Sequence, residues 1–242
     1  GTGLPGVYAS GRDQLTIKNC IIHTPSASDT YANISIRNST RVLIQNNQIY
    51  GNVGGAGITS IAGHSTNATY ANGTIITSNI IHDNNVDGIQ IHGEYHTIEN
   101  NSIYRNINTD WATTHPDGIQ ASYGTVDGIE GNNHVIIRNN LIYSHTQNVF
   151  IEGNSADKTA SDFLIYNNIV YTEAGTVNGV DLDAIAIKGI VTKDVGGLGA
   201  IRIYNNTIGR HSNVPLYISA AAATTSVYMQ NNLISNNFGG SV

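Results

Sequence analysis

One short phrase recurs along the whole sequence. An aliphatic residue and a spacer precede a two-residue pair, usually Asn-Asn, and a second spacer and aliphatic residue follow it. The first residues of these pairs are Asn19, Asn46, Ser78, Asn100, Asn139, Asn167, Asn205 and Asn231, on average about 30 residues apart. A constant phrase with uneven spacing predicts stacked coils joined by loops of different length.

The residues on either side of the pair alternate between aliphatic and other types, which is the pattern of β-strands. Before the pair, one aliphatic column contains Ile17, Ile44, Ile76, Ile98, Ile137, Ile165, Ile203 and Met229. After it, a second column contains Ile22, Ile49, Ile81, Ile103, Ile142, Val170, Ile208 and Ile234. Uniform columns of this kind predict parallel strands around a continuous core. The pair itself fits a corner, because Asn tolerates left-handed backbone angles and stacked amides can bond to each other.

A third strand is expected in each coil. It reads GVYASG, NISIRN, GITSIAG, GIQIHG, GIQASY, NVFIEG, AIAIKG and PLYISA, starting at residues 6, 33, 57, 88, 118, 148, 184 and 215. The sequence therefore predicts an all-β fold of about eight coils, with three parallel sheets and an Asn ladder at one corner. A single domain over residues 1–242 is expected, since elongated β-folds often reach this size undivided.

With these strands and the Asn corner, the chain resembles the right-handed parallel β-helices of the pectate-lyase-like superfamily. The resemblance implies that the ladder lies between the second and third sheets. It also implies that strands of the GIQIHG type form the first sheet, whose outer face is the substrate groove. This superfamily contains lyases, hydrolases, epimerases, phage depolymerases and structural stalks, so the fold leaves the activity open.

Composition excludes some partners. A net charge of −6 argues against a nucleic-acid groove, and no apolar run approaches the length of a membrane span. Cys20 is the only cysteine, so no disulfide framework is expected, and its ladder position predicts a buried thiol. The chain begins with Gly-Thr-Gly and lacks amphipathic end caps, which predicts a trimmed portion of a larger secreted or surface protein, with flanking domains or self-association at open coil ends.

The outer face of the third strand concentrates the few charged residues. Continuing the alternation of GIQIHG places Gln90 and His92 outside, and Gln120 beside Gln90 on the next coil. The predicted substrate-binding residues are Gln90, Gln120, Glu152, Lys188 and Arg37, with Lys188 next to Glu152. A polysaccharide or oligosaccharide is the expected partner.

The segments DGIQIHG and HPDGIQAS occupy neighbouring coils, which predicts that Asp87 lies near Asp117, with His92 and His115 beside them. Two carboxylates about 5 Å apart predict a shared proton or cation, and a histidine is suited to proton transfer near neutral pH. The predicted catalytic residues are His92, Asp117, His115 and Asp87, and Asp87 and Asp117 are also the candidate Ca²⁺ ligands. The alternative is that both Asp residues only cap turns.

Two aromatic features lie outside the strands of the first sheet. Trp111, in the long loop before Asp117, would either stack on a sugar ring or anchor the loop. An outward file is predicted to stack along the strand that follows the Asn pair in each coil, and it contains His23, Tyr50, His82, Tyr104, Tyr143 and Tyr171.

Three functional hypotheses remain open from the sequence. The first is a carbohydrate-active enzyme that cleaves an acidic polysaccharide by β-elimination. The second is a non-catalytic carbohydrate-binding or structural β-helix module of a surface protein or phage fibre. The third is a glycoside hydrolase that uses Asp87 and Asp117, whose predicted spacing is that of a retaining pair. The signatures of polygalacturonases and alginate epimerases are absent from the sequence.

Overall fold

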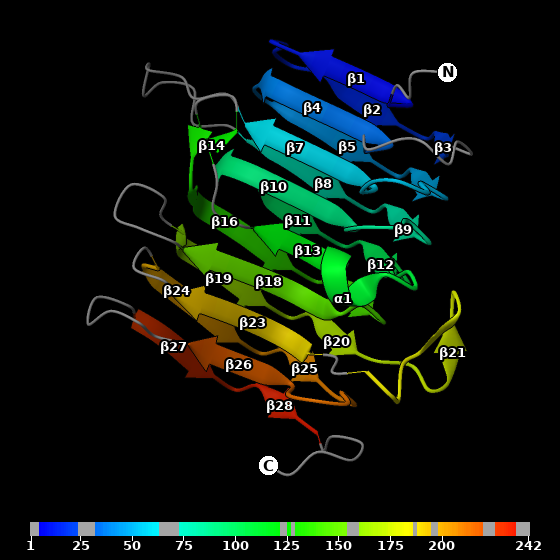
Figure 1. Cartoon of the computed structure of the whole chain (residues 1–242). Coiled ribbons are helices and arrows are strands. Elements are labelled where there is room, and N and C mark those ends of the chain that lie inside the picture. Colours follow the sequence, from blue (N-terminus) through cyan, green and yellow to red (C-terminus); the bar gives the residue numbers. More distant parts are fainter. Residues whose placement is uncertain are drawn as a thin grey trace.

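The computed structural model describes residues 5–23, 32–62, 73–121, 125–126, 129–153, 160–185, 188–194, 198–219 and 226–235. Within them the chain winds into a stack of coils, each contributing one strand to each of three parallel sheets (Figure 1). This confirms the predicted fold class. No helix in the described segments is long and apolar enough to cross a membrane.

The first sheet faces outward on one side of the stack. Its strands pair in parallel register, for example Ile89 with Ile119 and Gln90 with Gln120. In stacking order, its strands are β1 (Val7–Ser10), β4 (Ile34–Ser39), β7 (Ile58–Ala62), β10 (Ile89–Glu94), β13 (Asp117–Ala121), β18 (Gln147–Gly153), β23 (Lys188–Asp194) and β26 (Leu216–Ser219).

The second and third sheets flank the Asn corner. The second contains β2 (Thr16–Lys18), β5 (Val42–Gln45), β8 (Thr74–Thr77), β11 (Thr97–Glu99), β16 (Asn132–Arg138), β19 (Ala160–Tyr166), β24 (Ala200–Tyr204) and β27 (Ser226–Gln230). The third contains β3 (Ile21–His23), β6 (Gln48–Tyr50), β9 (Ile80–His82), β12 (Ser102–Tyr104), β17 (Leu141–Tyr143), β20 (Ile169–Tyr171), β25 (Thr207–Ile208) and β28 (Leu233–Ile234).

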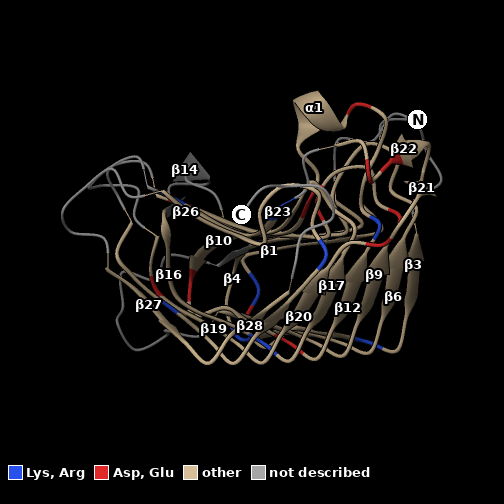
Figure 2. Cartoon of the chain, turned by 90° about the horizontal axis from the view of Figure 1, so that it is seen from below, with Lys and Arg blue, Asp and Glu red and all other residues tan. Residues whose placement is uncertain are grey.

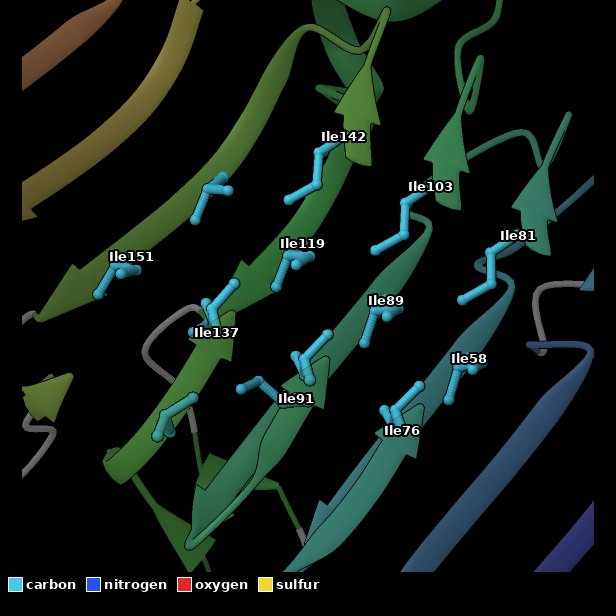
Figure 3. Close-up of a cluster of buried hydrophobic side chains, with 14 of the residues drawn as sticks. Ile58, Ile76, Ile81, Ile89, Ile91, Ile103, Ile119, Ile137, Ile142 and Ile151 are labelled. Atoms are coloured by element: carbon cyan, nitrogen blue, oxygen red, sulfur yellow. The ribbon is translucent and has the colours of Figure 1, made fainter. Parts of the chain in front are cut away.

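Isoleucine fills the space between the sheets. Side chains such as Ile58, Ile89 and Ile119 of the first sheet meet Ile76 and Ile137 of the second and Ile103 of the third (Figure 3). All of them are fully buried. At about 25 cal/mol per Å² of apolar area, these repeated columns supply most of the favourable free energy of folding.

The two residues of each Asn pair have different tasks. The first adopts a left-handed backbone, with φ of 56° at Asn139. The second forms the amide ladder, in which Asn140 donates to Asn168 at 3.0 Å and accepts from Asn101 at 3.0 Å. At the first coil Cys20 stands in this ladder column. It is exposed, so the prediction of a buried thiol is wrong.

The aromatic file stacks as predicted. Ring centroids from His23 through Tyr50, His82, Tyr104 and Tyr143 to Tyr171 are 4.7–5.2 Å apart, with nearly parallel planes. The ring faces cover each other and only their edges face outward. This file therefore stabilises the third sheet instead of offering ring faces to a ligand.

Two excursions from the coils build a wall next to the first sheet. One carries the short helix α1 (Trp111–Thr114), which stands clear of the coils (Figure 2). The other carries the hairpin β21 (Thr176–Val177) and β22 (Val180–Asp181). A second hairpin, β14 (Thr125–Val126) and β15 (Ile129–Glu130), extends from the opposite end of the first sheet.

Candidate functional site

Each of two neighbouring coils enters the first sheet through an Asp-Gly step. Gly88 and Gly118 lie where the chain passes close to the next coil. A Cβ on Gly88 would lie 2.6 Å from the carbonyl oxygen of Gly118, and one on Gly118 would lie 2.4 Å from that of Asn148. No side chain fits there, so the glycines permit the tight corner that presents Asp87 and Asp117 side by side.

The two carboxyl groups are connected through the backbone. The Asp117 N–H donates to Oδ1 of Asp87 at 2.9 Å, and Oδ2 of Asp117 accepts from the Gln120 amide at 3.2 Å. Oδ1 of Asp117 is buried without a hydrogen-bond partner. Asp87 is 2% exposed and Asp117 is 0% exposed. The predicted pair therefore forms, with one unused acceptor in a buried position.

Burial changes the acidity of both groups. It raises the pKa of Asp87 to about 7. The pKa of Asp117 is also raised, first by burial and then by the neighbouring Asp87 carboxyl group. Two adjacent carboxyls that resist ionisation titrate as a pair and retain a proton close to neutral pH. Such a pair can both accept and donate a proton in that range.

The residues in register with Asp117 along the sheet, here called the carboxyl column, carry an amide and then a positive charge. Asp117 is in register with Gln147 of β18, and Gln147 is in register with Lys188 of β23. The positive charge of Lys188 and the amides of Gln120 and Gln147 favour the ionised form of Asp117 and so oppose its pKa rise. The Lys188 ammonium also lies over the Tyr217 ring, 5.4 Å from its centroid.

Lys188 does not pair with Glu152, which corrects the register predicted from AIAIKG. The strand of this coil begins at Lys188, and Glu152 is in register with Lys193. Nζ of Lys193 lies 2.5 Å from Oε1 of Glu152. The shift moves Lys188 from the Glu152 column to the carboxyl column.

His92 lies away from the carboxyl pair, so the predicted convergence is wrong. It is five residues beyond Asp87, which along a strand is about 16 Å. The side chain is 5% exposed, its Nδ1 has no hydrogen-bond partner, and burial lowers its pKa to about 4. Its carbonyl oxygen accepts from Nε2 of His96 at 2.9 Å. His92 cannot share a proton transfer with Asp117.

The remaining predicted residues occupy the wall and the flank. His115 is exposed at the end of α1, two residues before Asp117, with φ of 43°. Trp111 packs against a small cluster formed by Ile107 and the β21–β22 excursion, which fits the loop-anchor interpretation. Arg37 lies on β4, separated from β10 by β7, and is half-buried.

Two carboxyl groups do not by themselves complete the Ca²⁺ site predicted at this pair, which stays a prediction. Calcium takes six to eight oxygen ligands. Oδ1 of Asp87 and Oδ2 of Asp117 already accept hydrogen bonds, and no group of three His, Cys, Asp or Glu side chains with metal-binding geometry occurs among the described residues. We assign no role to a metal at this pair.

Comparison with known proteins identifies the family. The family model described as a right-handed beta helix region matches residues 1–126. The chain belongs to this family. A search of curated protein sequences gives no significant match to this β-helix protein.

Solved structures with the same fold share little sequence with this β-helix protein. The Azotobacter vinelandii mannuronan C-5 epimerase AlgE4 A-module superposes with a TM-score of 0.59 at 16% identity, covering 90% of this chain and 54% of that one. A T265N mutant of the periplasmic alginate epimerase AlgG superposes with a TM-score of 0.56 at 15% identity, covering 95% of this chain and 47% of that one. The Streptococcus pneumoniae surface protein and adhesin PfbA superposes with a TM-score of 0.56 at 13% identity, covering 97% of this chain and 67% of that one. The chain thus spans about half the length of the two epimerase structures, and these likenesses establish the fold alone.

Sequence reasoning missed part of the site on this β-helix. Gln147 lies in the carboxyl column and was not predicted, whereas Lys188 was predicted but placed in the wrong column, where Lys193 pairs with Glu152 instead. The available signal was the Gly-Ile step at Gly88, Gly118 and Gly189, since each of these glycines approaches the next coil closely. Aligning the coils on that step, instead of on period-two alternation, puts Lys188 in line with Asp87 and Asp117.

Proposed function

We propose that this protein cleaves an acidic polysaccharide by β-elimination on the outer face of the first sheet. The observation that carries the proposal is the buried Asp87–Asp117 pair, whose pKa values are raised toward neutrality, in one column with Lys188. The column provides a proton acceptor, a proton donor and a cation within a few strand spacings of about 4.8 Å.

The reaction needs each of these groups. A base removes the proton on C5 of a uronate, the electron pair forms the C4–C5 double bond, and the C4–O4 bond breaks. The leaving O4 then takes a proton from an acid. In the pair, the ionised carboxylate serves as the base and the protonated carboxyl as the acid, because burial and mutual repulsion raise both pKa values and leave the pair holding a proton. Lys188 attracts the uronate carboxylate and so favours loss of the C5 proton.

The neighbouring surface suits a sugar chain. Phe150 and Tyr217 lie on either side of the buried Val191 in one register row of β18, β23 and β26. Tyr217 is 43% exposed, and aromatic rings commonly contact the apolar face of sugars. Gln90 donates to Gln120 at 2.6 Å, so the two amides form a row that offers polar groups to hydroxyls.

The fold neighbours favour the same substrate class and location. Two of them are named as epimerases of mannuronan and alginate, and the change at C-5 named for one involves the atom from which β-elimination removes a proton. Another is a surface protein and one is periplasmic. We therefore propose that this chain acts on a uronate polymer outside the cytoplasm, as part of a secreted or surface protein.

The test is absorbance near 235 nm, which detects the unsaturated product, with a panel of uronate polymers with and without added Ca²⁺. We expect Asp117→Asn to lower the rate at least about 100-fold, because an amide can no longer accept or donate the proton. The control is Arg202→Gln, which removes a charge from the exposed pair with Asp162 on the second sheet. New reducing ends without absorbance would support hydrolysis and contradict β-elimination.

A non-catalytic module is the second candidate. The observation in its favour is the burial of the pair, because Asp87 and Asp117 expose almost no surface and Asp87 already bonds the backbone. In that case the sheet binds an acidic saccharide without changing it. Binding that is lost in Lys188→Met, together with no product across the polymer panel, would favour this module over the lyase.

A further inference from the structure

A second polar ladder runs inside the corner between the third and first sheets. It contains both amides and imidazoles, in contrast to the Asn ladder at the other corner. Its members are fully or almost fully buried: Asn33, Asn84, Asn106, His145, Asn148 and His211.

Backbone groups fix the direction of this ladder. The Asn84 N–H donates to Oδ1 of Asn106 at 3.0 Å, and Nδ2 of Asn84 donates to the same oxygen at 2.9 Å. Because this oxygen is held by a backbone donor, Nδ2 of Asn106 must be the group that faces Nε2 of His145, at 3.0 Å. Nε2 of His145 is therefore an acceptor and carries no proton.

The remaining bonds follow from that assignment. With Nε2 unprotonated, the proton of neutral His145 lies on Nδ1, which donates to Oδ1 of Asn148 at 2.9 Å. Nδ2 of Asn148 then donates to Nε2 of His211 at 3.0 Å. A protonated His145 would place an N–H against the Asn106 amide N–H. Asn106 cannot turn over without abandoning the backbone N–H of Asn84, so the ladder excludes the charged imidazole.

The ladder lies directly beneath the carboxyl pair. A Cβ on Gly88 would lie 2.8 Å from Nδ2 of Asn106, and a Cβ on Gly118 would lie 2.9 Å from Nδ1 of His145. The next residue after His145 also contacts the corner, since the Thr146 N–H donates to the Pro116 carbonyl at 2.9 Å. The 145–148 segment thus supports Asp117 from inside the corner and carries Gln147 beside it.

We propose that His145 is a positioning residue, which as the neutral Nδ1–H tautomer locks the Asp117–Gly118 corner and keeps water away from the carboxyl pair. Among the described residues, the titratable or charged groups next to this part of the ladder are His211 beyond Asn148, Asp117 beside Gly118, and Lys188, whose carbonyl oxygen lies 3.5 Å from Nδ2 of Asn148. This inference concerns the free protein and does not depend on the proposed reaction.

The tautomer is tested by nitrogen NMR of the full chain labelled at histidine, with His145→Gln used to assign the signal. We expect His145 to show a protonated Nδ1 and an unprotonated Nε2, unchanged from pH 8 to pH 5, where burial keeps it neutral. An Nε2–H tautomer, or a titration centred near pH 6.5, would overturn the assignment.

The positioning role is tested by carbon NMR titration of the Asp87 and Asp117 carboxyls. In His145→Leu the corner loosens and water reaches the pair, so its midpoints should fall by about one pH unit or more toward ordinary values. His145→Gln retains a donor and an acceptor and should recover part of the shift, and it also serves if the Leu variant does not fold.

The control for this titration is Asn168→Leu, which breaks the other ladder at a comparable buried position. It should destabilise the fold yet leave the carboxyl midpoints where they are in the wild type. Equal shifts in the His145 and Asn168 variants, or no shift in either His145 variant, would show that the ladder only adds stability and would overturn the positioning role.

Discussion

Replacing Asn140 by alanine should lower the free energy of unfolding by at least about 4 kcal/mol. Oδ1 of Asn140 accepts from the backbone N–H and the side-chain amide of Asn101, both at 3.0 Å. Its Nδ2 donates to the Ile98 carbonyl at 2.9 Å and to Oδ1 of Asn168 at 3.0 Å. Truncation removes all four of these buried bonds, each worth about 0.5–1.5 kcal/mol, and leaves the Asn101 backbone N–H without its acceptor, which costs about 1–3 kcal/mol more.

The neighbouring residue of the same pair provides the matched control. Asn139 supplies a left-handed turn with φ of 56°, which glycine adopts without steric cost. We expect Asn139→Gly to change the free energy of unfolding by less than about 1 kcal/mol. Urea unfolding of both variants measures the difference. Similar losses at the two positions would contradict the division of the Asn pair into a turn residue and a ladder residue.

Acid should destabilise this protein well before its carboxylates would ordinarily be protonated. Burial lowers the pKa of four histidines to about 4: His92, His96, His145 and His211. Between pH 6.5 and 4 the unfolded chain binds protons at these sites while the folded chain does not. Each histidine then removes up to about 1.4 kcal/mol of stability per pH unit.

The carboxyl pair acts in the opposite direction. Because the folded-state pKa values of Asp87 and Asp117 are raised above the usual 3.8, the folded chain binds protons first as the pH falls from 7, which favours folding. The two carboxyls stabilise the folded chain as the pH falls, and the four histidines destabilise it. The net result is a loss of about 3 kcal/mol in the free energy of unfolding for each pH unit over this window.

Urea midpoints measured at pH 7.5, 6.5, 5.5 and 5 test this balance. We expect them to fall steeply below pH 6.5. His96→Gln should reduce the slope, because it removes one buried imidazole. His134→Gln is the matched control at an exposed imidazole, which is stacked on Tyr95. A flat profile from pH 7.5 to 5 would mean that these imidazoles titrate normally.

The coil architecture could be predicted because it is repeated. Every coil contributes to the same aliphatic columns, so an ambiguous register in one coil is resolved by the other coils. The Asp87–Asp117 contact follows from the same repetition, since identical segments in neighbouring coils must lie in register.

The chemistry of the site depends on features that do not repeat. Alternation in AIAIKG imitates a strand of the first sheet, but the strand starts at Lys188 because Gly189 must meet the Pro215 carbonyl of the next coil. His92 follows the expected alternation, yet its side chain is buried. Alternation predicts the side of the strand on which a residue lies, but not which other side chains cover it. The burial that raises the pKa of Asp117 likewise comes from side chains of several coils, which one segment of sequence does not reveal.

We propose that the outer face of the first sheet binds an acidic saccharide through the column of Asp117, Gln147 and Lys188. Isothermal titration calorimetry with length-matched uronate and neutral oligosaccharides tests it most directly. We expect only the uronate oligomer to bind. Salt should weaken this binding, Lys188→Met should abolish it and Arg202→Gln should retain it. Equal binding of the neutral oligomer, or uronate binding that survives Lys188→Met unchanged, would contradict it.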